Sequence, residues 1–264
     1  MIAKELREAK WKVLPGLLIP LFIALNLVFT SPADIDATYV AHRLHNLSAV
    51  ASQPVSAYDS AVWIFSFTLN TGFAFMLLVL AAALGAGLIA SETSRGSMFF
   101  LLSRPVSRDR LLLTKYAVCA ALLLGLVVLI GLAALVVPAA YGHPQHPGGV
   151  VISIILFWLE TLFVLGVALV CSVVIRGTLL AMIVALVSVF LMSDLPTYLY
   201  NLAQDFGWST ITHNSVVALS LGTYWSNLDA FAGNSFPWQS LLVSVIVAAI
   251  PVIVALVLFR RRAY

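Results

Sequence analysis

The sequence predicts an all-α integral membrane protein with six transmembrane helices, an amphipathic helix at its start, and both termini in the cytoplasm. The first observation is composition: hydrophobic residues make up 62% of the 264 positions and charged residues only 9%, against about 25% charged residues in soluble domains. The second is a set of six long apolar stretches, and the third is the distribution of basic residues between them. So little charge cannot cover a water-facing surface, which excludes a soluble globular domain, a disordered chain and a disulfide-stabilised secreted domain.

Six stretches are long enough to cross a hydrocarbon core of about 30 Å, which takes about 20 apolar residues in a helix. They are residues 13–31, 61–90, 111–138, 149–175, 178–199 and 238–259. The runs are continuous and do not alternate with a period of two, so they predict helices rather than barrel strands. The second and third stretches approach 30 residues, and we expect those helices to tilt or to extend beyond the bilayer.

Lysine and arginine define the orientation of the spans, because these residues concentrate on the cytoplasmic side of membrane proteins. Of the 14 basic residues, only Arg43 falls on the side opposite to the others. The others lie in the first twelve residues, between the second and third spans, at Arg176 and at 260–262. We therefore expect both ends of the chain in the cytoplasm and an even number of spans.

Residues 1–12 predict an amphipathic helix at the membrane surface. Apolar side chains recur three and four positions apart and therefore share one helix face: Ile2, Leu6, Ala9 and Val13. Lys4, Arg7 and Lys12 lie away from that face, where they can contact anionic lipid headgroups. A basic tail without helical structure is the alternative interpretation.

The segment between the second and third spans predicts a short cytoplasmic helix over residues 97–103. Gly96 allows a turn, Ser97 can cap the helix, and Pro105 ends it. The middle of this helix is apolar and its rim is basic, with Met98, Phe99, Phe100, Leu101 and Leu102 in the middle and Arg95, Arg104 and Arg108 on the rim. An apolar plug with a charged rim is typical of a docking site for a partner protein. A helix lying on the lipid headgroups is the alternative.

Polar residues inside the predicted spans are candidates for a translocation path. Glu160 is near the middle of the fourth span, where an ionised carboxyl costs about 2.5–3.5 kcal/mol and should therefore face protein or water. Asn70 and Thr71 form a polar patch in the second span. We expect Glu160, Asn70 and Thr71 to line the path, or alternatively to form hydrogen bonds between helices.

The outer side carries the aromatic segment 200–237, which contains no lysine or arginine and predicts an interfacial or re-entrant structure. All five histidines are also expected on this side, but their loop setting does not predict a metal site. Cys119 and Cys171 fall inside apolar runs, and we interpret both as free thiols.

The cytoplasmic segment, together with the six-span topology, resembles the ABC-2-type permease family. The residues that carry the resemblance are Glu92, Arg95-Gly96-Ser97, Leu101-Leu102-Ser103, Arg104, Pro105-Val106-Ser107-Arg108 and Lys115. The resemblance implies a single membrane domain over residues 1–264, with an elbow helix at 1–12 and a coupling helix at 97–103. It also implies two ATP-binding subunits and a second permease copy as partners, in the plasma membrane of a bacterium or an archaeon. The implied coupling residues are Glu92, Arg95, Gly96, Ser97, Met98, Phe99, Phe100, Leu101, Leu102, Arg104, Pro105 and Arg108.

No Gly-Lys pair occurs in the sequence, so it contains no Walker A loop to hold nucleotide phosphates. We therefore expect a permease that is not itself an enzyme and carries no cofactor, with ATP and magnesium on the partner subunit, and no nucleic-acid partner. The resemblance favours an exporter. A secondary transporter and a membrane scaffold without an ATPase partner are the alternatives. The sequence is compatible with lipid, peptide, drug or ion substrates, and with a homodimer or a heterodimer.

Overall fold

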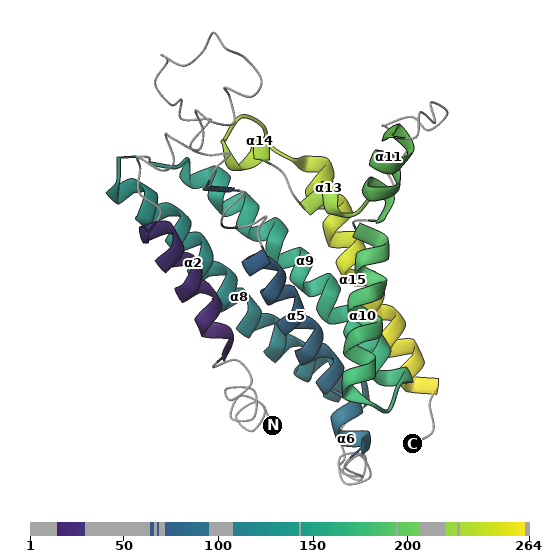
Figure 1. Ribbon diagram of the computed structural model, residues 1–264. Helices are drawn as coiled ribbons and strands as arrows, with labels where there is room; N and C mark the ends of the chain where they lie inside the picture. The colour runs from purple at the N-terminus through teal and green to yellow at the C-terminus, as the bar shows by residue number, and fades with distance from the viewer. Residues whose placement is uncertain are drawn as a thin grey trace.

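A computed structural model shows a bundle of helices whose long members run side by side (Figure 1). The structure describes residues 15–29, 64–65, 68, 72–94, 108–142, 144–193, 195–205, 220–225 and 228–261. Every regular element in these ranges is helical, which agrees with the predicted all-α class. The predicted helix over residues 1–12 lies outside the described ranges.

The helices follow one another along the chain with short connections where both neighbours are described. In order they are η1 (Pro15–Leu17), α2 (Leu18–Phe29), α5 (Gly72–Gly87), α6 (Ala90–Ser94), α8 (Arg108–Ala140), α9 (Pro147–Val174), α10 (Thr178–Ser193), α11 (Leu195–Asp205), α13 (Gly222–Trp225), α14 (Leu228–Phe231) and α15 (Trp238–Arg261).

Among the helices in the described ranges, three are long and apolar enough to cross a membrane: α8, α9 and α15. They contain the predicted spans 111–138, 149–175 and 238–259, except that Ile175, the last residue of 149–175, lies just after α9. The 33 residues of α8 extend about 50 Å at 1.5 Å per residue, so this helix is longer than the hydrocarbon core is thick. Two shorter apolar helices, Phe75–Gly87 and Thr178–Ser193, fall in the second and fifth predicted spans.

The fifth predicted span, 178–199, is divided in the structure because α10 ends at Ser193 and α11 begins at Leu195. Residue 196 is a proline, which has no N–H to donate to the carbonyl of Met192 one turn earlier. The backbone N–H of Leu221 donates to that carbonyl instead, at 3.2 Å. The Ser220 hydroxyl donates to the carbonyl of Ser193. The end of α10 is therefore completed by a distant segment of chain.

The second predicted span, 61–90, also ends earlier than expected. Helix α5 stops at Gly87, a turn covers Leu88 and Ile89, and α6 begins at Ala90. The turn is closed by a hydrogen bond of 3.2 Å from the Leu88 N–H to the Gly85 carbonyl. This turn separates the apolar helix from the polar residues that follow it.

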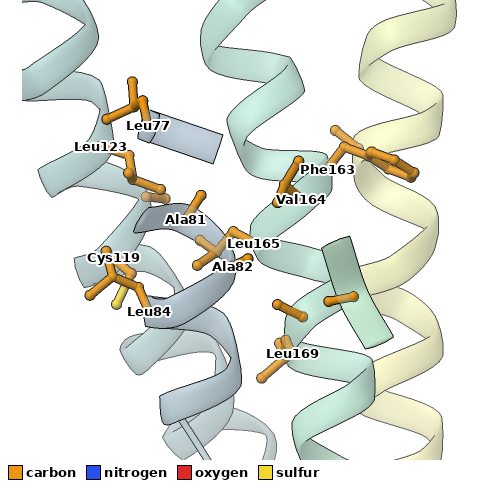
Figure 2. Close-up of a cluster of buried hydrophobic side chains, with 14 of the residues drawn as sticks. Leu77, Ala81, Ala82, Leu84, Cys119, Leu123, Phe163, Val164, Leu165 and Leu169 are labelled. Carbon is orange, nitrogen blue, oxygen red and sulfur yellow. The ribbon is translucent and has the colours of Figure 1, made fainter. Parts of the chain in front are cut away.

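The core lies where α5, α8 and α9 meet (Figure 2). Leu77, Ala81, Ala82 and Leu84 of α5 pack against Cys119 and Leu123 of α8 and against Phe163, Val164, Leu165 and Leu169 of α9. The small side chains of α5 permit a close helix crossing. At Gly85 the two helices approach closely, because an added Cβ would lie 2.6 Å from the Leu165 carbonyl oxygen of α9.

A second, smaller cluster lies toward the other end of the bundle. Phe65 and Phe231 place their ring centroids 5.3 Å apart, and Ala134 and Val150 are buried with them. At the start of α9, the His146 side chain caps the helix because its Nδ1 accepts a hydrogen bond of 3.1 Å from the Gly149 N–H. This histidine, which the sequence placed in an unstructured loop, has a defined structural role.

Helix α6 projects at one end of the bundle, where α2 begins and α15 ends (Figure 1). The short helices α13 and α14 lie at the opposite end (Figure 1). The start of α2 and the end of α15 therefore lie at the same end of the bundle as the polar residues of α6 (Figure 1).

Candidate docking site on the cytoplasmic side

The candidate docking site is the chain between α6 and α8. We call residues 95–107 the docking segment. The predicted site residues Arg95, Gly96, Ser97, Met98, Phe99, Phe100, Leu101, Leu102, Arg104 and Pro105 all belong to it and lie outside the described residues. The structure describes its two flanks, with Glu92 in α6 and Arg108 as the first residue of α8.

An ion pair joins the two flanks of the docking segment. The Lys115 ammonium of α8 donates to Oε1 of Glu92 in α6. Lys115 is only 4% exposed and Glu92 18%, and Nζ also lies 3.5 Å from the Leu88 carbonyl oxygen in the turn before α6. A buried charge is tolerated when it is paired in this way, and removal of one partner leaves the other uncompensated. The pair therefore fixes α6 against α8, the two helices that flank the docking segment along the chain.

Hydroxyl groups in α6 stabilise the same short helix. Thr93 donates to the Ile89 carbonyl at 3.0 Å, and Ser91 donates to the Gly87 carbonyl. Gly87 is the last residue of α5, whereas the Ile89 carbonyl in the turn also accepts the backbone N–H groups of Glu92 and Thr93. The polar residues that follow the apolar helix thus complete its end.

A second ion pair lies at the start of α8, two residues after the docking segment along the chain. Arg260 of α15 holds the Asp109 carboxylate of α8 with two nitrogens, Nε at 2.9 Å from Oδ1 and Nη2 at 2.6 Å from Oδ2. Both residues lie outside the predicted spans 111–138 and 238–259. The hydrogen bonds from the Arg260 guanidinium hold the pKa of Asp109 below its usual value. This contact joins the last helix to the first turn of α8.

The candidates for a translocation path are only partly described. Glu160 is half-buried on α9, whereas Asn70 and Thr71 lie outside the described residues. The nearby Thr68 is buried, and its hydroxyl donates to the Ile64 carbonyl of its own helix at 2.6 Å. Within the described residues, no group of three histidine, cysteine or acidic side chains is placed to hold a metal ion.

Sequence reasoning selected Glu92 and Lys115 as motif positions, but it did not predict that they touch. It also did not predict the Asp109–Arg260 pair, whose partners are 151 positions apart. A motif search detects residues that are close in sequence. The one available signal was opposite charge at the ends of two apolar runs that are both predicted to reach the cytoplasm.

Comparison with known proteins identifies the family. No curated protein matches the chain. The family model for ABC-2 family transporter proteins matches residues 2–263. This match includes all the described helices and the docking segment between them. Because it covers almost the whole sequence, the chain belongs to the ABC-2 transporter family and is a multi-pass membrane permease of an ABC transporter.

Proposed function

We propose that the chain is the membrane half of an ATP-driven exporter and that a separate ATP-binding subunit docks on residues 95–107. The observation that carries this proposal is the ABC-2 family match over residues 2–263. The Glu92–Lys115 ion pair adds support, because it holds both flanks of the docking segment at one point of the bundle. Two permease copies and two ATP-binding subunits form the working unit, in a bacterial or archaeal plasma membrane.

The docking segment and its flanking residues Glu92 and Arg108 each have a proposed role. The apolar residues 98–102 fill a groove of the partner, while Arg95, Arg104 and Arg108 contact acidic groups around it. Gly96, Ser97 and Pro105 define the ends of the docking helix. Glu92 positions this helix through Lys115. ATP and magnesium bind to the partner, and closure of the two ATP-binding subunits moves the docking helices.

The translocation path is proposed to pass Glu160 on α9, together with Asn70 and Thr71. A half-buried carboxyl within an apolar helix is costly unless it meets protein or water, which favours a functional position. Replacement of Glu160 by Gln keeps the shape and removes the charge. We expect this variant to change the rate or the pH dependence of transport in proteoliposomes, and an unchanged profile would remove Glu160 from the path.

Co-purification tests the docking proposal. The full chain is purified in mild detergent from its native cell, and the proteins recovered with it are identified by mass spectrometry. We expect an ATP-binding subunit in equal stoichiometry, and we expect Phe99→Asp or Leu102→Asp to abolish its recovery. Phe236→Asp is the matched control, because Phe236 is 48% exposed and lies in the connection before α15, far along the chain from the docking segment.

The outcomes separate the competing functions. Loss of the partner with Phe99→Asp but not with Phe236→Asp supports an ATP-driven permease that docks through residues 95–107. A wild-type chain that purifies alone, without ATPase activity in the fraction, favours a secondary transporter or a membrane scaffold. Export is tested with inside-out vesicles, in which an exporter accumulates substrate in the lumen when ATP is added outside.

A further inference from the structure

We propose that α8 and α9 move as one rigid unit that carries displacement of the docking segment into the centre of the bundle. Tyr116 and Trp158 are the positioning residues that lock the two helices together. The inference rests on the proposed function, because the displacement originates in the ATP-binding partner. It adds a defined route from the docking segment to the membrane interior.

Two hydrogen bonds form the lock. The Tyr116 hydroxyl of α8 donates to the Leu162 carbonyl of α9 at 3.1 Å. The Trp158 Nε1–H of α9 donates to the Ala120 carbonyl of α8 at 3.2 Å. Tyr116 and Ala120 are one turn apart on α8, and Trp158 and Leu162 are one turn apart on α9. Each helix therefore supplies one aromatic donor and one backbone acceptor to the other.

The reciprocal arrangement restricts more motion than a single bond would. The helices are antiparallel, and the two bonds are about 6 Å apart along them, which is four residues at 1.5 Å each. A single hydrogen bond leaves a pivot, whereas two bonds separated along the axis oppose both sliding and rotation. Both bonds are partly buried, and buried apolar side chains flank the donors in sequence, Cys119 and Leu123 on α8 and Leu159 and Phe163 on α9, which limits the access of water to them.

The lock begins one residue after the α8 partner of the ion pair that joins α6 to α8. Lys115, which pairs with Glu92, is the residue before Tyr116. A displacement of the docking segment therefore enters α8 at the turn that is bound to α9. Helix α9 in turn packs against α5, α10, α13, α14 and α15. Movement of the α8–α9 unit thus reaches most of the described helices without an additional joint.

Pulsed electron paramagnetic resonance can measure this rigidity in the full complex in nanodiscs. Spin labels are placed at Val136 on α8 and Val151 on α9, both exposed, with Cys119 and Cys171 replaced by alanine. The α8–α9 distance is recorded without nucleotide and with ADP and vanadate. The test variant combines Tyr116→Phe with Trp158→Phe. Tyr198→Phe and Trp238→Phe are matched controls, because they remove the same donors at positions that are 66% and 69% exposed.

In the wild type and in both controls, we expect the α8–α9 distance to change with nucleotide by less than about 2 Å, the scale of small helix shifts. In the double variant, the distance should become nucleotide-dependent. The population of the conformer in which α8 and α9 are separated should increase about sevenfold, as expected for the loss of two membrane hydrogen bonds. ATP hydrolysis should stay within twofold of wild type, because the docking segment is intact.

Three results would overturn the inference. The first is a wild-type distance that already changes by about one helical turn of 5.4 Å. The second is a double variant that behaves like the controls. The third is a double variant whose distance is altered equally with and without nucleotide, because this would indicate a purely structural role. Failure of the proposed function gives a different pattern, in which the wild-type chain recruits no ATP-binding subunit. In that case the width of the α8–α9 distance distribution decides: equal widths in the wild-type chain and the double variant would refute the lock, and a wider distribution in the variant would support it.

Discussion

Replacement of Gly85 by alanine tests the close crossing of α5 and α9. An added Cβ would lie 2.6 Å from the Leu165 carbonyl oxygen and 2.7 Å from the Ala168 Cβ. The first is a backbone atom and the second a short, rigid side-chain atom, so neither can rotate away. The two helices must therefore separate by about half an ångström, a gap that forfeits about a quarter of the contact energy of the atoms that line it.

The expected cost of Gly85→Ala is the overpacking penalty of about 1–3 kcal/mol. Alanine also gains about 1 kcal/mol in helix propensity over glycine, so the comparison needs a control with the same gain. Gly125 on α8 provides it, because an added Cβ there meets nothing within 4 Å. The difference between the two variants isolates the crossing, and it corresponds to a melting temperature lower by about 2–12 °C for Gly85→Ala.

Thermal unfolding in detergent, followed by fluorescence-detected size exclusion, measures this difference. Gly131→Ala is an intermediate case, because its new Cβ would overlap the Ile154 side chain, which can change rotamer. The predicted order of apparent melting temperature is Gly125→Ala highest, then Gly131→Ala, then Gly85→Ala. Equal values for Gly85→Ala and Gly125→Ala would refute the close crossing.

Three further predictions concern single contacts. Lys115→Met should destabilise the chain by about 3–5 kcal/mol in thermal unfolding, because it removes the Lys115 cation from the carboxylate of Glu92, which is only 18% exposed. The Lys115→Met, Glu92→Gln double variant should recover much of this loss. A double variant no better than the single one would contradict the reasoning. Asp109→Asn should lower the apparent melting temperature slightly in low salt and not in high salt. Because the pKa of Asp109 is lowered in the folded state, the stabilisation by its ion pair with Arg260 should be complete above about pH 4 to 5. This stabilisation should be lost on acidification below the usual aspartate pKa of about 3.9. His146→Ala should cost about 1 kcal/mol as a lost helix cap, whereas His146→Asn should retain stability; equal losses for both variants would show that the ring, and not its acceptor, matters.

Local patterns predicted the features that depend on neighbouring residues. The apolar runs at 111–138, 149–175 and 238–259 correspond to α8, α9 and α15, because hydrophobic length determines whether a helix can span a bilayer. The docking segment is predicted from the order of glycine, apolar residues and proline along the chain, and it lies outside the described residues.

Features that join distant residues could not be predicted in this way. The Tyr116 and Trp158 hydrogen bonds use backbone carbonyls as acceptors, and every residue has one, so the sequence contains no sign of which carbonyl is used. The Asp109–Arg260 pair depends on how α8 and α15 are placed in three dimensions. The division of 178–199 had a visible signal in Pro196, but hydropathy averages over such a single position and predicts one continuous helix.

The Leu221 N–H that replaces the missing donor of Pro196 has a consequence for the tolerance of the chain to change. Because Met192 and Ser193 are joined to Leu221 and Ser220, the two ends of the intervening chain are held together, and in connectivity this chain is a closed loop whatever its own structure. Lengthening a closed loop is cheap, about 0.6 kcal/mol for each doubling. An epitope or a small reporter domain inserted between residues 206 and 219 should therefore leave the helix bundle intact. The base of this loop is a suitable point for exchanging outer segments between related permeases.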